Sequence, residues 1–113
     1  MQAFELSNLI QQRATQGDAY LEFLSVPDLS MGIYCLPKDG TDPQQPHAEA
    51  EVYFVVSGKC HFICGSEEQA ISAGSVLYVP KNVPHRFLQI EEDLTLLVFF
   101  APAEGTSAVK REL

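Results

Sequence analysis

The residues best suited to chemistry begin with a histidine and two glutamates in one alternating segment. His47 follows a proline-punctuated approach, and Glu49 and Glu51 occupy the next alternate positions. Side chains alternate along a strand, so both carboxylates would point the same way as the core residues after them. A carboxylate turned into a protein interior is costly unless it is paired, hydrogen-bonded or bound to a cation. The segment therefore indicates a bound metal ion.

A second segment, residues 74–89, is built in the same way. A short apolar run leads into a turn bounded by prolines, and His85 then opens another strand, on which Phe87 and Gln89 would share its face. If both strands line one cavity, two imidazoles and one or two carboxylates converge there. Such groups suit a divalent first-row transition metal with open positions for water or substrate. The main ligand candidates are His47, Glu51 and His85.

The first segment resembles the first motif of the cupin superfamily, G-x5-H-x-H-x3-4-E-x6-G. Glu51 and Gly58 fit its second half, and His47 stands at its second histidine. Gln45 occupies the position of the first histidine, and Gly40 lies one residue further upstream than the motif expects. The resemblance implies that His47 and Glu51 bind the metal and that Gln45 offers a weaker carbonyl ligand.

The second segment resembles the second cupin motif, G-x5-P-x-G-x2-H-x3-N, at Gly74, Pro80 and His85. Asn82 replaces its second glycine, and Gln89 replaces its final asparagine. Asparagine tolerates the left-handed backbone that a glycine often supplies, so the first change is mild. Two motifs in the right order are specific for the fold, whereas cupins carry out many different reactions.

The fold expected is all-β, because many short strands alternate with Gly/Pro turns. The resemblance covers about residues 20–101 and implies a small double-stranded β-helix, or jelly-roll barrel. Residues 1–19 are predicted to hold a short amphipathic helix, over 4–15, that packs on the barrel, and residues 102–113 form a tail. At 113 residues the chain is one domain.

The strands are predicted to be short, with tight turns between them. A connection at Ser57-Gly58 would separate the first motif strand from the next, and the acidic residues 91–93 would form another turn. The other strands expected are residues 20–26, 30–36, 59–64, 69–72, 76–79, 85–90 and 94–101. Cys60 and Cys64 would be small core residues on one strand face, rather than a zinc pair.

Two features of the metal shell remain open at this level. On an extended strand His47 and Glu51 would lie about 13 Å apart at their α-carbons, so both bind one ion only if the chain bends between them. Otherwise Glu49 ligates instead of Glu51, or beside it. Aromatic side chains would line the rest of the cavity and suit a small, partly apolar ligand. They are Tyr34, Tyr53, Phe62, Phe87 and Phe99.

The function implied by the resemblance is a metal-dependent enzyme that acts on a small organic molecule. An oxygenase would need a redox metal such as iron, whereas an isomerase or lyase could use zinc, manganese or nickel. Glu49 or Tyr53 would then carry the proton. The alternative is a non-catalytic module that binds a metal or small ligand. Cupins of this size commonly pair, so we also expect a homodimer.

The composition excludes some partners. The formal charge is −8, the predicted pI is near 4.6, and the seven basic residues are scattered, so we expect no nucleic-acid binding. The N-terminus lacks the basic and apolar regions of a secretory signal, and no apolar run is long enough for a membrane span. A cytoplasmic protein is predicted.

Overall fold

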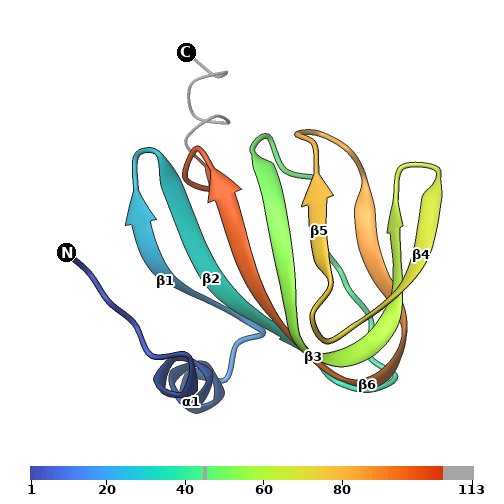
Figure 1. Cartoon of the computed structure of the whole chain (residues 1–113), viewed down its shortest axis with the longest axis horizontal. Coiled ribbons are helices and arrows are strands. Elements are labelled where there is room, and N and C mark those ends of the chain that lie inside the picture. Colours follow the sequence, from blue (N-terminus) through green and yellow to red (C-terminus); the bar gives the residue numbers. More distant parts are fainter. Residues whose placement is uncertain (45, 106–113) are drawn as a thin grey trace.

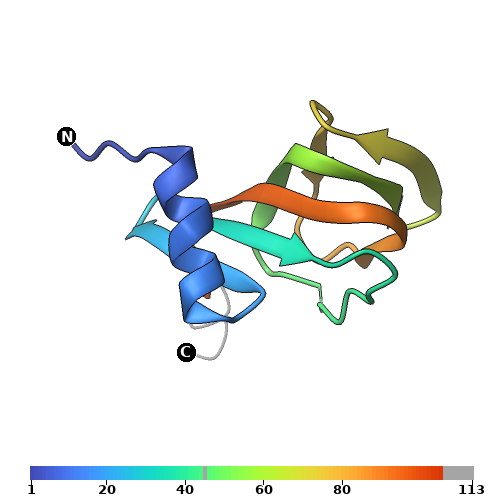
Figure 2. The same cartoon turned by 90° about the horizontal axis from the view of Figure 1, so that it is seen from below.

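The computed structural model of the chain describes residues 1–44 and 46–105. It consists of one curled antiparallel sheet with a helix against its outside (Figures 1 and 2). The elements are α1 (Leu6–Gln16), β1 (Tyr20–Val26), β2 (Leu29–Leu36), β3 (Ala50–Cys64), β4 (Glu67–Ser72), β5 (Val76–Val79) and β6 (His85–Ala101). The predicted small jelly-roll barrel with a short N-terminal helix is confirmed.

Two long strands form the centre of the sheet. The strand order is β1-β2-β6-β3-β4, and β5 also pairs with β3. Along the β3–β6 ladder, Glu51 pairs with Phe100 at one end and Cys64 pairs with His85 at the other. Glu51 and His85 are therefore distant along the ladder, and the curl of the sheet is what brings them together (Figure 1).

The predicted breaks at Ser57-Gly58 and at residues 91–93 are wrong, because β3 and β6 each run continuously. Register shifts between Val55 and His61 absorb the bend instead. Gly58 lies in this region with φ 106°. A Cβ at Gly58 would lie 2.6 Å from the backbone oxygen of Asp93, so the strands could not approach as closely with any other residue there.

A bulge at Gln89 reverses which side chains of β6 face the core. Its φ is 48°, and it is exposed, whereas Ile90 is buried. Before the bulge the odd-numbered positions point inward, and after it the even-numbered positions do. The predictions that Gln89 and Phe99 face the cavity are therefore wrong, and Phe100 occupies the inward position.

The N-terminal helix covers one end of the sheet. It contacts β1 and β2, buries Leu9, and ends at Gly17, whose left-handed backbone caps it. The helix predicted from residues 4–15 is thus present with slightly shifted ends. No helix in the described part of the chain is long and apolar enough to cross a membrane. Most of the predicted tail, residues 106–113, lies outside the described residues.

Candidate metal centre and its pocket

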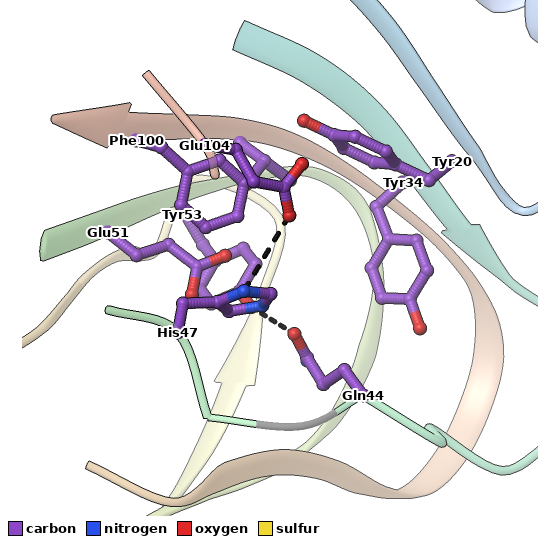
Figure 3. A pocket seen from close by; sticks show the side chains of 9 residues that line it. Tyr20, Tyr34, Gln44, His47, Glu51, Tyr53, Phe100 and Glu104 are labelled. Atoms are coloured by element: carbon purple, nitrogen blue, oxygen red, sulfur yellow. Dashed lines mark hydrogen bonds and ion pairs between the residues drawn. The ribbon is translucent and has the colours of Figure 1, made fainter. Parts of the chain in front are cut away.

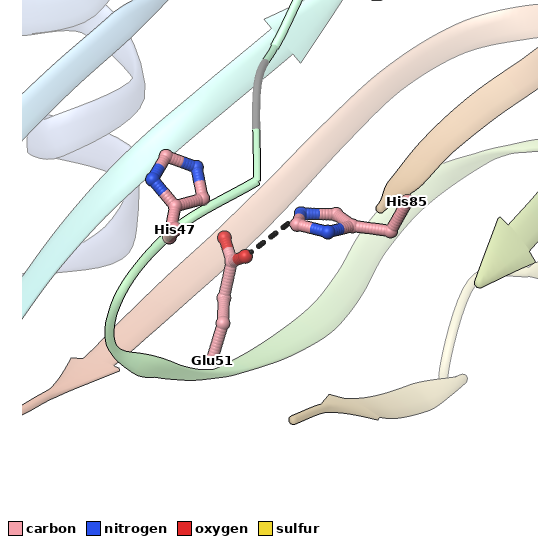
Figure 4. Close-up of side chains that lie close together, drawn as sticks. All are labelled: His47, Glu51 and His85. Atoms are coloured by element: carbon pink, nitrogen blue, oxygen red, sulfur yellow. Dashed lines mark ion pairs between the residues drawn. The ribbon is translucent and has the colours of Figure 1, made fainter. Parts of the chain in front are cut away.

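Three of the predicted ligands come together in the barrel. Ligand atoms of His47, Glu51 and His85 all lie within 4.8 Å of one another (Figure 4). Because β3 begins only at Ala50, the chain bends after His47, and the imidazole can approach the carboxylate. The bend that the sequence left open is therefore present. Glu51, and not Glu49, joins the two histidines.

The ring of His85 is held in the orientation that a metal ligand needs. Its Nδ1 lies 2.8 Å from the carbonyl oxygen of Val83, so Nδ1–H donates to that oxygen. In the neutral ring the lone pair is then on Nε2, which lies 3.0 Å from Oε1 of Glu51 and 3.2 Å from the hydroxyl of Tyr53. Histidines that bind metals commonly donate their other N–H to a carbonyl in this way.

The carboxylate of Glu51 also fits a cation. Its side chain is 1% exposed, and among the described residues Oε1 has no hydrogen-bond partner and only the ion-pair contact with Nε2 of His85 at 3.0 Å. Two atoms bound to one first-row ion at about 2.1 Å each are at most about 4.2 Å apart. Glu51 and His85 already meet that limit, and His47 would need only a small shift. These donors fit a divalent ion.

Without an ion, the negative groups around His85 favour its protonated ring. Burial lowers the pKa of His85, but the Glu51 carboxylate, the Val83 carbonyl and the charge of Asp42 raise it, and the net pKa is above its ordinary value. Binding through Nε2 requires the neutral ring, so a metal ion would compete with that proton.

The other predicted site residues are Tyr53, Glu49 and Gln45. Tyr53 is fully buried, and its hydroxyl reaches the cluster through His85. Glu49 is 3% exposed and its Oε2 has no hydrogen-bond partner among the described residues, but it does not join the three ligands. Gln45 lies outside the described residues.

Asp42, a buried carboxylate that the sequence analysis did not predict, forms hydrogen bonds with residues around the site. Asp42 accepts hydrogen bonds from the Tyr34 hydroxyl at 2.7 Å, from Nε2 of Gln44 at 2.6 Å and from the backbone N–H of Phe87 at 3.0 Å. Gln44 in turn accepts the Tyr53 hydroxyl at 2.8 Å. Asp42 precedes a proline in the sequence, and no local signal marks its partner at Phe87.

A pocket of about 170 Å³ adjoins the candidate metal centre (Figure 3). It contains His47 and Glu51, whereas the two larger surface hollows, of about 490 and 580 Å³, contain neither. The remaining lining residues are Tyr20, Tyr34, Gln44, Tyr53, Val98, Phe100 and Glu104. Tyr34 and Tyr53 were predicted, whereas Tyr20 and Glu104 were missed because they come from the two ends of the barrel sequence.

Glu104 is the closest charged neighbour of His47 in the described structure. Its Oε2 lies 3.6 Å from Nδ1 of His47. The backbone N–H of Glu104 donates to Oγ of the fully buried Ser30 at 2.8 Å, which holds the segment after β6 against β2. A carboxylate beside one ring nitrogen helps to orient a ligand histidine.

Comparison with known proteins agrees with the fold. Residues 32–100 match the family model described as "Cupin domain". The chain is 48% identical over 105 residues to the Uncharacterized protein SCO3923 of Streptomyces coelicolor, which covers 93% of this chain and 100% of that protein.

Solved structures show the same fold at low sequence identity. An RmlC-like cupin of Methanocaldococcus jannaschii has a TM-score of 0.68 and 17% identity, over 74% of this chain and 79% of that one. The DMSP lyase DddQ of Ruegeria pomeroyi has a TM-score of 0.65 and 18% identity, over 78% of this chain and 49% of that one. The chain belongs to the cupin family.

Proposed function

We propose that this cupin binds one divalent transition-metal ion, iron, zinc, manganese or nickel, and acts as an enzyme on a small organic molecule. The ligands would be His47, Glu51 and His85. The observation that carries the proposal is the buried Oε1 of Glu51, which has no hydrogen-bond partner among the described residues and faces Nε2 of His85 at 3.0 Å. Such an arrangement is costly without a positive charge, which a bound ion would supply in place of a proton on His85.

The proposed reaction class depends on Tyr53, the residue that would carry a proton. A bound ion would supply Lewis-acid chemistry, polarising a carbonyl or stabilising an enolate. Tyr53 lines the pocket, and its hydroxyl donates to Gln44 and contacts Nε2 of His85. Burial first, and then the charge of Glu51, raise its pKa, so the phenol keeps its proton until that charge is offset.

A phenol placed in this way supports isomerase or lyase chemistry, with Tyr53 taking or giving a proton at its oxygen. Glu49, the other predicted proton carrier, is buried but does not line the pocket, so Tyr53 is the better placed of the two. An oxygenase reaction remains compatible with the same ligands and would require iron. The lyase activity named for one structural neighbour lends no further weight, because that likeness shows only the fold.

A second candidate is a non-catalytic module that binds a metal or small ligand. The observation that favours it is Gln45, which stands where the first cupin motif has a histidine. An amide oxygen is a weaker ligand than imidazole for a transition metal. Turnover of any compound by the wild type, lost in Tyr53→Phe with the metal content unchanged, would reject this candidate.

The metal site is tested by elemental analysis of protein purified without an affinity tag. We expect about one transition-metal ion per chain in the wild type, and a loss of at least about tenfold in His47→Ala, Glu51→Gln and His85→Ala. The matched control is His61→Ala, since His61 is partly exposed and contacts Glu68 on β4. A folded wild type without metal would contradict the proposal, and zinc alone would contradict an oxygenase.

A further inference from the structure

The pocket beside the candidate metal centre is acidic and aromatic. Its described lining residues include no lysine or arginine, and its carboxylates are those of Glu51 and Glu104. If Glu51 binds the metal, then Glu104 is the carboxylate left to face a bound molecule. Aromatic side chains, among them Tyr20, Tyr34 and Phe100, form much of the wall. A pocket with this lining attracts a cation and repels an anion.

Glu104 lines this pocket and is partly exposed. Its backbone is anchored to Ser30, and its side chain is 35% exposed, whereas that of His47 beside it is 21% exposed. Three other carboxylates, those of Glu22, Glu49 and Glu51, act on Glu104 with like charge. A ligand cation would relieve this repulsion.

Tyr20 supplies a hydroxyl without a partner at the same end of the pocket. Its oxygen is buried and has no hydrogen-bond partner among residues 1–44 and 46–105. Figure 3 shows this hydroxyl and the Glu104 carboxylate on the same side of the pocket, with Gln44 on the other side. The ring fits only because residue 32 is glycine, since a Cβ there would overlap the phenol. A buried hydroxyl of this kind is costly unless a ligand satisfies it.

The Tyr20 hydroxyl is a donor at any working pH. Burial, followed by the charge of Glu104, raises its pKa far above the ordinary value. Its ring packs edge-on against that of Tyr34, with the ring centroids 6.2 Å apart. The end of the pocket therefore combines aromatic rings, a carboxylate and one hydroxyl donor.

We propose that Tyr20, Tyr34 and Glu104 form a subsite for the cationic head of a small organic molecule, an amine or a quaternary onium group. Aromatic faces and a carboxylate attract such a head, and the Tyr20 hydroxyl donates to an oxygen of the same molecule. The pocket volume of about 170 Å³ is close to that of cavities that admit benzene, so the ligand has about six or seven non-hydrogen atoms. This inference names the substrate class. It rests on the proposed function, because the metal centre would determine which end of the molecule reacts.

The test compares two ligands of the same shape that differ in charge. Choline is titrated into the metal-loaded protein by ligand-observed NMR, beside dimethylbutanol, in which a carbon replaces the nitrogen. We expect choline to bind at least about tenfold more tightly. In Glu104→Gln this preference should fall to about twofold or less, because the carboxylate charge is removed. Tyr20→Phe should weaken both ligands to a similar extent, because both carry the hydroxyl oxygen.

The matched control is Glu22→Gln, which removes a carboxylate that acts on Glu104 but does not line the pocket. It should leave the preference for choline within about twofold of the wild type. Equal binding of the two ligands, an unchanged preference in Glu104→Gln, or no choline binding would each overturn the subsite. Elemental analysis of the same samples tests the metal site separately, so a metal-free protein that still prefers choline would reject the proposed function alone.

Discussion

The hydroxyl of Tyr53 donates a 2.8 Å hydrogen bond to Oε1 of Gln44, which connects β3 to the segment that precedes it. Gln44 is fixed in turn by its amide, which donates to Oδ2 of Asp42. The phenol proton therefore points toward Gln44, and the phenol oxygen can accept from Nε2 of His85 only when that ring is protonated. The direction of the phenol group proposed to carry a proton depends on Asp42, which forms no hydrogen bond with the candidate metal ligands among the described residues.

Asp42→Ala is expected to lower the free energy of unfolding by about 3 kcal/mol. The substitution removes the acceptor for the Tyr34 hydroxyl and for the Phe87 N–H, and buried donors without acceptors are costly. Urea unfolding followed by circular dichroism gives the value. The control is Asp93→Ala, since the side chain of Asp93 accepts a hydrogen bond at 2.8 Å only from the exposed backbone N–H of Lys38 among the described residues, and it should cost less than about 1 kcal/mol. Equal losses in the two variants would contradict this role of Asp42.

Gly58→Ala tests the close approach of the two central strands. Gly58 and Gly74 both have left-handed φ values, 106° and 95°, but a Cβ at Gly58 would lie 2.8 Å from Cα of Leu94, and a Cβ at Gly74 would meet nothing within 4 Å. Gly74→Ala should therefore cost about 1 kcal/mol from backbone strain alone. Gly58→Ala should cost at least about 2 kcal/mol more, because the strands must separate. Thermal unfolding of both variants measures the difference in the free energy of unfolding. Equal losses would mean that β3 and β6 separate at little cost.

The cluster of His47, Glu51 and His85 could be predicted because its signal is local. Each histidine follows a proline-containing segment at the start of a strand, and Glu51 lies at a fixed spacing from His47. The left-handed backbone expected at Asn82 is confirmed by its φ of 64°. By contrast, the sequence could not choose between Glu49 and Glu51, because that choice depends on where β3 begins.

Other features had no local signal. Glutamine rarely adopts a left-handed φ, so the residue type at Gln89 did not predict a bulge. That bulge turns Phe100 inward in place of Phe99. Tyr20 and Glu104 meet only because β2 and β6 pair and bring the two ends of the barrel together. Contacts between segments so distant in the chain are set by the register of the whole sheet.

The thiol of Cys60 is expected to resist alkylation at about pH 8. Cys60 is 1% exposed, and burial, with the charges of Asp42 and Glu91, raises its pKa from 9.0 to about 11. The fold favours the neutral thiol, so this contribution to stability is present below pH 9.0 and is lost as the pH rises toward about 11. Mass spectrometry after iodoacetamide treatment should find the partly buried Cys64 modified first. Faster modification of Cys60 than of Cys64 would contradict its placement in the core.

The predicted homodimer can be tested at an apolar patch on the outer face of the sheet. Val76 and Tyr78 on β5 are 67% and 66% exposed, and they pair with Phe54 and Val52 of β3. Exposed apolar side chains grouped in this way are typical of a surface that another chain covers. We expect a dimer at micromolar concentration by sedimentation, and a monomer for Tyr78→Lys, because a buried unpaired charge opposes association. Val26→Lys changes an exposed apolar residue at the end of β1 and should remain dimeric. A monomeric wild type would reject the dimer, and a dimeric Tyr78→Lys would place the interface on another face.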